Sequence, residues 1–371
     1  MVVEELNKGP EQLKNEVIAG GWCVSCGACV ELCPYIKAVK DRVAVVHSCG
    51  LNSGNCYAVC PRTYTDYNKL APYYENSQND GAIGSYMSIT QARATEKKIK
   101  ELGQYGGVVS ALLIQSTGTH EAKEVLLTDY EGIYPRWLIG RNSEDILRSA
   151  GSKYAVCPGL SGLNLALRKK IEQIDIVGRP CQVVALQKMK NYSEVEGKEK
   201  IGLIIGLFCF WGLDYGIYDY LKQEYNITRI DKADIPKDAG LTVSTDQGTI
   251  TLSLEETRSF IRNGCYSCVD STSELADISV GSTELDSKWC TVIIRTKKGE
   301  DIFNKAIGSG LIETKPYPVE LKAALSESAL NKKKRVIGNE VDDEGPVINN
   351  GYLKITESAA RLIGMGGIID D

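Results

Sequence analysis

The feature that most constrains this chain is a run of cysteines near the N-terminus, Cys23-x-x-Cys26-x-x-Cys29-x-x-x-Cys33 followed by Pro34. This spacing is typical of iron–sulfur ligands, in which three closely spaced thiolates bind one cluster and the fourth cysteine ligates another. The chain has 13 cysteines, an odd number, and no charged-then-apolar signal segment at its start. A disulfide framework is therefore disfavoured, and metal-binding thiolates are the better interpretation.

A second run closes this region and ends Cys56-x-x-x-Cys60-Pro61. In two-cluster ferredoxins the last cysteine of one run joins the first three of the other. The sequence thus predicts a ferredoxin-like module with one complete 4Fe–4S site, on Cys23, Cys26, Cys29 and Cys60. A zinc ion on the same four thiolates is the alternative.

The same exchange leaves three thiolates, Cys33, Cys49 and Cys56, for a second site. Such a site can hold a 3Fe–4S cluster, or a 4Fe–4S cluster whose last ligand is Ser53, an asparagine, water or His47. The other interpretation is that these thiols bind nothing. We expect a second cluster here and leave its nuclearity open.

The composition disfavours several classes of function. The formal net charge of −5 and the pI of about 5.4 give no indication of nucleic-acid binding. The longest apolar run, residues 201–211, is too short to span a bilayer and indicates a buried parallel strand, so we expect a cytoplasmic protein. Only His47 and His120 are available for histidine-based chemistry. The basic run at 332–335 is expected to be solvated.

The hydrophobic pattern after the module predicts an α/β (α+β) fold with a mixed sheet. We expect helices over 108–116, 160–173 and 215–225 and from about residue 301, strands over 174–177, 201–208 and 291–296, and a hairpin turning at 246–248. The predicted domains are 1–80 (the module and a linker from Tyr64), 81–195, 196–331, and a tail over 332–371 that docks a partner or is a solvated extension.

Four cysteines far apart in the chain are predicted to share one site. Strand 174–177 leads into Cys181, and strand 201–208 ends at Cys209, so both thiols follow the carboxyl ends of strands. Ligands of open α/β sheets gather outside those ends. Cys265 and Cys268 add two thiolates at chelating spacing. Isolated buried cysteines are also common small core residues, and the remaining two are assigned to the core or surface: Cys157 and Cys290.

Six segments carry a family resemblance: GQYGGVVSALL (103–113), AGSKYAVCPGLSGL (150–163), GRPCQVVALQKM (178–189), IGLFC (205–209), GCYSC (264–268) and ELADISVGS (274–282). Across residues 85–330 the chain resembles the beta subunits of coenzyme F420-reducing hydrogenase and F420-dependent formate dehydrogenase, and the F420H2 dehydrogenase input subunits. The resemblance implies FAD, a 4Fe–4S cluster on Cys181, Cys209, Cys265 and Cys268, and hydride exchange between coenzyme F420 and FAD.

The resemblance also implies partners. These are other subunits of a redox complex, of the hydrogenase, formate dehydrogenase, heterodisulfide reductase or membrane dehydrogenase type, to or from which clusters pass single electrons. No side-chain catalyst is expected, because the cofactors carry the chemistry.

The implied FAD site uses three of these segments. Gly106 and Gly107 open a helix whose N-terminus can face a phosphate, although two glycines before a helix are more often only a turn. The stretch 151–154 offers flexible backbone, a hydroxyl, a cation and a ring, and is otherwise a helix-capping loop. The predicted FAD-binding residues are Gly106, Gly107, Val108, Ser110, Gly151, Ser152, Lys153, Tyr154, Pro180 and Gln182.

Two segments depart from the family pattern. Relatives usually carry Ser-Pro-Asp-Gly-Trp after the last matching segment, where this chain reads ELDSKW (284–289). Relatives also carry a Gly-Lys-rich segment before the hairpin, where this chain reads KDAG (237–240). These changes leave the hydride donor open. Beside the F420-dependent enzyme we therefore keep a non-catalytic electron-relay subunit and a flavin reductase that uses another donor.

Overall fold

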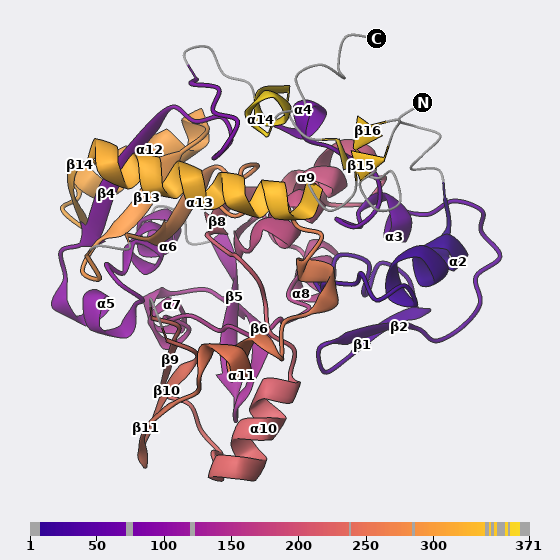
Figure 1. Ribbon diagram of the computed structural model, residues 1–371, viewed down its shortest axis with the longest axis horizontal. Coiled ribbons are helices and arrows are strands. Elements are labelled where there is room, and N and C mark those ends of the chain that lie inside the picture. The colour runs from indigo at the N-terminus through magenta and orange to yellow at the C-terminus, as the bar shows by residue number, and fades with distance from the viewer. Residues whose placement is uncertain are drawn as a thin grey trace.

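An eight-stranded mixed sheet forms the centre of the protein (Figure 1). The computed structural model describes residues 8–71, 77–118, 123–236, 239–283, 286–337, 341–342, 345–346, 353–354 and 357–363. The strand order is β14-β4-β13-β12-β8-β7-β5-β6. The strands are β4 Ser88–Ala94, β5 Lys123–Glu131, β6 Tyr134–Gly140, β7 Gln173–Gly178, β8 Ile201–Leu207, β12 Ile278–Ser282, β13 Cys290–Ile294 and β14 Ile312–Pro316.

The central strands β12, β8, β7 and β5 run parallel, and the flanking strands pair antiparallel. Strand β8 is apolar throughout, as expected for a parallel strand covered on both faces. Its side chains alternate, so Ile204 joins one hydrophobic core while Leu203 and Ile205 join the other. The expected fold class is confirmed, and the carboxyl ends of the four parallel strands meet at one edge of the sheet.

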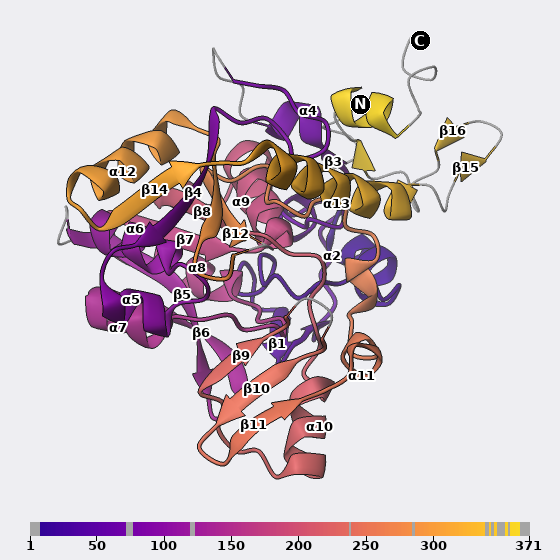
Figure 2. The ribbon, with the colours of Figure 1, turned by 60° about the vertical axis from the view of Figure 1, so that its left-hand side comes forward.

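Helices cover both faces of the sheet (Figure 2). One face carries α5 Lys97–Leu102, α6 Val108–Gly118, α7 Ser143–Arg148 and α12 Lys297–Gly308, and the other carries α8 Leu160–Leu167 and α9 Pro180–Tyr192. Helix α12 begins earlier than expected because the Thr296 side chain accepts a hydrogen bond from the Gly299 amide at 3.1 Å. Pro180 occupies the first turn of α9, where its missing N–H costs nothing.

The N-terminal module has a small core of its own. It contains α2 Pro10–Gln12, the π-helical turn η1 Leu13–Ile18, the hairpin β1 Ile36–Val39 and β2 Arg42–Val45, and α3 Asn55–Ala58. In Figure 1 it lies on the right, beside α8.

The module is fixed to the rest of the chain by buried polar contacts. Asn164 of α8 donates to the carbonyls of Ala28 and Val30, at 2.8 and 2.6 Å. The guanidinium of Arg262 pairs with Asp41 in the hairpin turn at 2.6 Å, and both side chains are almost fully buried. These contacts join the module to two segments more than a hundred residues away in sequence.

Part of the expected linker is packed into the core. Strand β3 Thr65–Asp66 and helix α4 Tyr67–Leu70 follow the module, and α4 contacts α9. Tyr67 and Leu70 are buried in the core around α8 and α9, and Asp66 caps α4 by accepting from the Asn68 amide at 3.0 Å. The linker prediction was wrong for these residues, because their aromatic and aliphatic side chains find a tertiary partner. Residues 72–76 lie outside the described part of the chain.

A second, smaller sheet stands at the bottom of Figure 1, away from the main one. It contains the predicted hairpin and has its own core. Its elements are β9 Lys232–Asp234, β10 Thr242–Thr245 and β11 Gly248–Thr251, with α10 Gly216–Tyr225 and α11 Leu254–Arg258 beside them. There are also two short 3₁₀ turns: η2 Lys198–Lys200 precedes β8 of the main sheet, and η3 Asn263–Cys265 follows α11.

Helix α13, Val319–Ile337, runs across the upper part of Figure 1 and continues past the boundary expected at residue 332. The expectation that 332–335 is solvated was wrong for two of its residues, since Lys332 and Lys333 are 3% and 2% exposed. Beyond α13 the described elements are β15 Val341–Asp342, β16 Gly345–Pro346, β17 Leu353–Lys354 and α14 Glu357–Leu362. Among the described residues, no helix has the length and apolar character needed to cross a bilayer.

Candidate functional site

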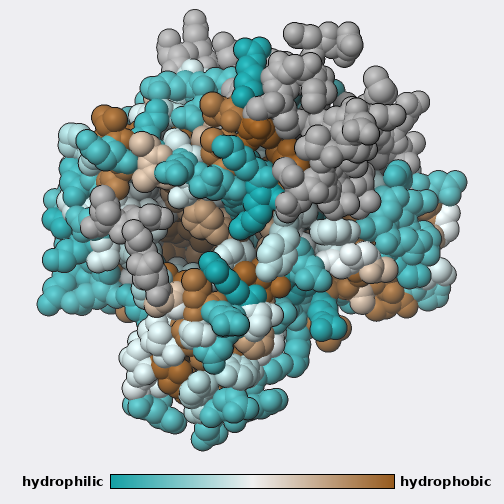
Figure 3. All heavy atoms as spheres, viewed as in Figure 1, coloured by the Kyte–Doolittle hydropathy of each residue, from teal (hydrophilic) through white to brown (hydrophobic). Residues whose placement is uncertain are grey.

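A deep cavity of about 590 Å³ opens at the edge where the parallel strands end. Figure 3 shows its mouth as a hollow lined by apolar residues. The walls come from the loop before α6, the loop after α7, the ends of β7, β8 and β12, and one side of α13. The volume is within the range of about 300–1,000 Å³ that is usual for pockets that hold a cofactor or a small ligand.

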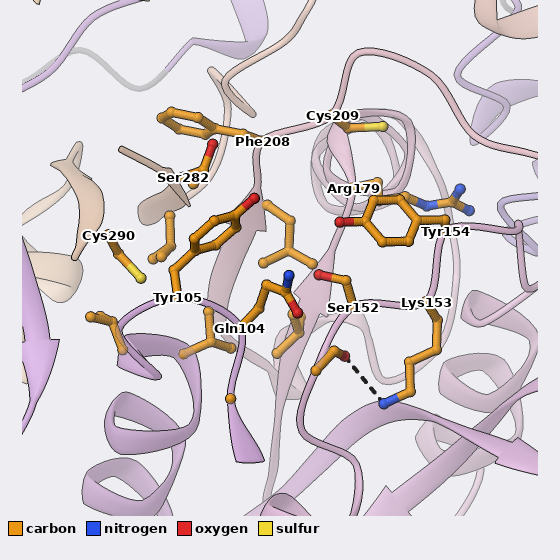
Figure 4. Close-up of a pocket in the computed structure, with 18 of the residues that line it drawn as sticks. Gln104, Tyr105, Ser152, Lys153, Tyr154, Arg179, Phe208, Cys209, Ser282 and Cys290 are labelled. Carbon is orange, nitrogen blue, oxygen red and sulfur yellow. Dashed lines mark hydrogen bonds between the residues drawn. The ribbon is translucent and has the colours of Figure 1, made fainter. Parts of the chain in front are cut away.

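Polar groups reach the cavity from several elements (Figure 4). Gln104 and Tyr105 come from the loop before α6, Ser152 from the loop after α7, and Ser282 from the end of β12. Gln104 Oε1 and Ser149 Oγ, both in the cavity wall, are buried without a hydrogen-bond partner in the described structure. Buried polar atoms are normally paired, so these two are available to a ligand.

The N-terminus of α6 faces the cavity. Gly107, Val108 and Ser110 line it, and Gly107 has a φ of +70° that favours glycine. A Cβ at Gly107 would also lie 2.8 Å from the carbonyl oxygen of Ile99. The positive end of the helix dipole suits an anionic group.

Most of the predicted FAD-binding residues line this cavity, and two do not. The lining ones are Gly107, Val108, Ser110, Gly151, Ser152, Lys153, Tyr154 and Gln182. Gly106 lies behind the wall, where a Cβ would meet Arg93 and Ala92, and Pro180 is buried in the first turn of α9. These two residues shape the backbone, Gly106 by allowing close packing against β4 and Pro180 by starting α9, and neither lines the cavity.

The Lys153 ammonium group is turned away from the centre of the cavity (Figure 4). It donates to the backbone carbonyls of Ser149, Ala150 and Gly151, at 2.6, 3.0 and 3.2 Å, and lies 5.5 Å from the centre of the Tyr130 ring. Burial lowers the pKa of Lys153 to about 8. The lysine therefore stabilises the loop that follows α7 through these hydrogen bonds. An anion nearby would raise its pKa again.

The four cysteines that sequence reasoning grouped together form what we call the inner thiol group: Cys181, Cys209, Cys265 and Cys268. Cys181 is in the first turn of α9, Cys209 follows β8, and Cys265 ends η3. Burial raises the pKa of Cys181 and Cys209. The charge of Cys265 adds to this at both thiols, and that of Cys268 adds to it at Cys181, so these thiols are electrostatic neighbours. Cys209 also lines the cavity.

Cations surround the inner thiol group. Burial raises the pKa of Cys209 to about 12, and Lys332 and Arg179 oppose this. For Cys268, burial also acts to raise the pKa, but Lys332 and Arg62 outweigh it and the pKa is lowered. Arg179 belongs to the cavity wall, and its charge also acts to lower the pKa of Cys181, which burial raises. The surroundings thus favour an anionic group at these sulfurs.

The first thiol group of the module, Cys23, Cys26, Cys29 and Cys60, lies next to the inner one. Burial raises the pKa of Cys26 well above its usual value, and the charges of Cys181 and Cys60 add to the effect. Lys188 of α9 is fully buried here and donates to the Cys60 carbonyl and to Thr63 Oγ1, both at 2.6 Å. Burial lowers the pKa of Lys188 to about 7.

The second thiol group of the module, Cys33, Cys49 and Cys56, lies farther out. Cys33 and Cys49 are partly exposed, and Cys56 is buried. Burial raises the pKa of Cys56 to about 11, with further contributions from Cys33 and Cys49. His47 is exposed, its ring stacks on Tyr35, and its Nδ1 lies 2.9 Å from the Ser48 carbonyl oxygen. His120 lies outside the described residues.

Within the described ranges, no three histidine, cysteine or carboxylate side chains come close enough to hold a single metal ion. A four-iron cluster spaces its thiolates more widely than one ion does, because iron and sulfide lie between them. The cluster ligands therefore remain predictions, supported by the electrostatic neighbourhood of each group.

Sequence reasoning missed several cavity residues. Gln104 and Tyr105 precede the two glycines of the GQYGG segment, and Arg179 lies two residues before Cys181 in the GRPCQ segment. Their proximity in sequence to predicted site residues could have identified them. Cys157 and Cys290, assigned to the core or surface, are buried and also line the cavity. The α13 residues Leu321, Ala324, Leu325 and Ser328 had no such signal, because they belong to an ordinary amphipathic pattern.

Comparison with known proteins gives two adjacent family matches. Residues 89–164 match the N-terminal model of the coenzyme F420 hydrogenase/dehydrogenase beta subunit, and residues 171–320 match its C-terminal model. The chain is 34% identical to coenzyme F420 hydrogenase subunit beta of Methanococcus voltae, over 63% of this chain and 85% of that protein.

A longer match is to an F420H2 dehydrogenase subunit of Methanosarcina mazei, with 29% identity over 84% of this chain and 90% of that protein. Among solved structures, a chain of the F420-reducing NiFe hydrogenase complex from Methanosarcina barkeri superposes with a TM-score of 0.65 and 28% identity. That superposition covers 74% of this chain and 99% of the other.

Proposed function

Because this chain belongs to the family of coenzyme F420 hydrogenase/dehydrogenase beta subunits, we propose that it is an iron–sulfur flavoprotein subunit of an F420-dependent redox complex. It exchanges a hydride between coenzyme F420 and FAD and relays single electrons through clusters to or from partner subunits. The observation that carries this proposal is that the cavity and the inner thiol group share Cys209, and that Arg179 lines the cavity and acts on the charge of the same thiol.

The cavity fits FAD. Its walls offer the α6 N-terminus for a diphosphate, the Tyr105 and Tyr154 rings for packing, and the unpaired Gln104 Oε1 and Ser149 Oγ for polar contacts. An isoalloxazine is largely apolar with a polar rim, which agrees with a mainly apolar wall that carries a few converging polar groups.

The inner and first thiol groups fit 4Fe–4S clusters. Each supplies four thiols, and each has buried cations within electrostatic reach, such as Arg179 and Lys188. Burial raises the pKa of Cys181 and Cys209 in the inner group and of Cys26, Cys29 and Cys60 in the first group. A thiolate-bound cluster is anionic, and a buried anion is stable only where opposite charge or hydrogen bonds compensate it. The second thiol group of the module, which we also call the outer group, supplies three thiols. This number fits a 3Fe–4S cluster, or a 4Fe–4S cluster whose fourth ligand is not a cysteine.

When bound, FAD would exchange a hydride with the deazaflavin and exchange electrons singly with the clusters. The chain's own part is to position and to exclude water. The walls of β8, β12 and α13 close the cavity on its apolar sides, and Arg179 holds a positive charge between the cavity and the inner thiol group. Cys26 of the first thiol group is an electrostatic neighbour of Cys181, so the proposed electron path continues from the inner cluster into the module.

The test uses the full chain purified without oxygen and supplied with FAD. We expect oxidation of reduced F420 with a one-electron dye as acceptor, and flavin, iron and sulfide bound to the protein. Bound flavin and clusters without F420 oxidation would favour the relay subunit, and oxidation of NADH or NADPH instead would favour a reductase with another donor.

A cavity-filling variant sharpens this test. Ser282→Trp places an indole in the cavity, while Ser287→Trp adds the same ring to an exposed residue of the following loop outside it. We expect Ser282→Trp to weaken FAD binding at least about tenfold, which equals about 1.4 kcal/mol, and Ser287→Trp to leave it unchanged. Equal FAD affinity in both variants would place the flavin elsewhere.

A further inference from the structure

Helix α13 connects the cavity to the inner thiol group. Its first half lines the cavity with residues such as Leu321 and Leu325, and its second half carries Lys332 into the interior. The match to the C-terminal family model ends at residue 320, so nearly all of this helix lies beyond the matched region. Its role therefore has to be argued from its own contacts.

Lys332 is 3% exposed, and its ammonium group donates to two backbone carbonyls, Cys209 O and Asp270 O, both at 2.7 Å. One acceptor belongs to a member of the inner thiol group, and the other lies two residues after Cys268. The lysine thus ties together the two chain segments that carry these thiols. Both hydrogen bonds are to neutral groups, so they do not cancel its charge.

The neighbouring lysine behaves differently. Lys333 is 2% exposed and forms an ion pair with the buried carboxylate of Glu274. For Lys332, no carboxylate of the described residues lies within 4.0 Å of the ammonium group. A buried ammonium group without a counter-ion is costly, so an anion is expected nearby.

The sulfurs of the inner thiol group are the atoms through which an anion would be held beside Lys332. Cys268 Sγ and the Lys332 ammonium group both donate to the Asp270 carbonyl oxygen, at 3.4 and 2.7 Å, so this thiol lies next to the lysine. The ammonium group also donates to the backbone carbonyl of Cys209 at 2.7 Å. A cluster held by these thiols would therefore be the counter-ion of Lys332.

Resting on the proposed function, we propose that Lys332 is a positioning residue that raises the reduction potential of the cluster on Cys181, Cys209, Cys265 and Cys268. Reduction adds one electron to an anionic cluster, and a fixed positive charge beside it stabilises the reduced form more than the oxidised form. The lysine thereby makes this cluster a better acceptor of electrons from the flavin cavity.

The test is a dye-mediated redox titration of the full holoprotein, followed by EPR. Lys332→Gln removes the charge while its amide can still donate to both carbonyls. We expect the reduction equilibrium of the inner cluster to fall about tenfold, equal to about 59 mV for a one-electron couple, with the module signals unchanged. Lys332→Arg keeps the charge and should keep the wild-type potential.

A matched control removes a buried lysine without changing the local net charge. The double variant Lys333→Met with Glu274→Gln deletes the neighbouring ion pair and should leave the inner potential where it is. An unchanged potential in Lys332→Gln, or an equal shift in the double variant, would overturn the proposal. If Lys332→Gln does not fold, Lys332→Arg decides, because a tenfold shift despite the retained charge also overturns it.

The failure of this proposal differs from the failure of the proposed function. Wild-type protein without iron at the inner thiol group would contradict the cluster assignment itself. Wild-type protein with the cluster, and Lys332→Gln with the same potential, would contradict only the role of the lysine.

Discussion

The two thiol groups of the N-terminal module share a motif type but differ in their surroundings. The first group, with Cys26, Cys29 and Cys60 buried, packs against α8 and α9 and has Lys188 beside it. In the second group Cys33 and Cys49 are partly exposed, and the pKa of Cys56 is set mainly by burial and by these two thiols. One end of the module is built as part of the interior, and the other faces outward.

Under the proposed cluster assignment, this difference explains why the second thiol group can have one cysteine fewer than the first. A buried cluster needs every ligand from the protein, because water does not reach it, whereas an exposed site can take a ligand from solvent. The outer group is also the end that a partner protein can approach. The predictions below test this division between an interior path and an outer contact.

The largest effect is expected from removing an inner ligand. Cys181→Ser should lower the iron content by about four atoms per chain and abolish reduction of the module clusters by reduced F420. FAD should remain bound, since Cys181 does not line the cavity. Iron analysis, flavin absorbance and EPR measure these quantities, and module clusters that are still reduced at the wild-type rate would break the proposed path.

A smaller change is expected from the outer end. Cys56→Ser should remove about three to four iron atoms, leave F420 oxidation with a small dye unchanged, and abolish electron transfer to a partner protein. The readouts are iron content and turnover with the dye and with the partner. Loss of dye-coupled turnover would show that the outer group belongs to the interior path after all.

The interior packing of the first group predicts a stability effect. Lys188→Met removes the buried hydrogen bonds that the ammonium group donates to the Cys60 carbonyl and to Thr63 Oγ1, and should lower the free energy of unfolding by about 2–3 kcal/mol. Lys170→Met changes an exposed lysine and should stay within about 0.5 kcal/mol. Denaturant unfolding compares them, and equal stabilities would mean that Lys188 does not anchor the module.

The smallest effect concerns the cavity rather than the module. The pKa of Lys153 is lowered to about 8 in the protein, so the cofactor-free protein loses this charge as the pH rises through 8. A bound diphosphate would favour the charged form, so FAD affinity should fall about tenfold between pH 7 and 9. Fluorescence titration of FAD measures this, and Lys153→Met should show a flatter pH dependence.

The same lysine has a consequence for stability without FAD. Below pH 8 it is charged in both the folded and the unfolded chain, and its burial cost is present in full. Between pH 8 and its ordinary pKa near 10.5 only the unfolded chain keeps the proton, so this part of the stability rises with pH. A fall over that range, relative to Lys153→Met, would contradict the assignment.

Much of the fold could be predicted because its signals are local. The apolar run of β8, the turn before β11 and the glycines before α6 each specify their own element, and the places of Cys181 and Cys209 follow once β7 and β8 are parallel strands. The place of the 151–154 loop in the cavity wall agrees with what the family resemblance implied; its residue types alone would equally have fitted a helix-capping loop.

What could not be predicted depends on distant partners. Lys332 and Lys333 belong to a basic run that normally lies in water. Their burial depends on distant acceptors, which are the carbonyls of Cys209, Val269 and Asp270 and the carboxylate of Glu274. Tyr67 and Leu70 looked like parts of a linker because the surface that covers them, on α8 and α9, begins almost a hundred residues later.

The most direct measurement is an iron-edge anomalous difference map from crystals of the anaerobically purified, FAD-loaded protein. The account predicts a compact iron peak among the sulfurs of Cys181, Cys209, Cys265 and Cys268, directly beside flavin density in the cavity. Iron-free thiols at these positions, or flavin bound away from Cys209 and Arg179, would contradict it.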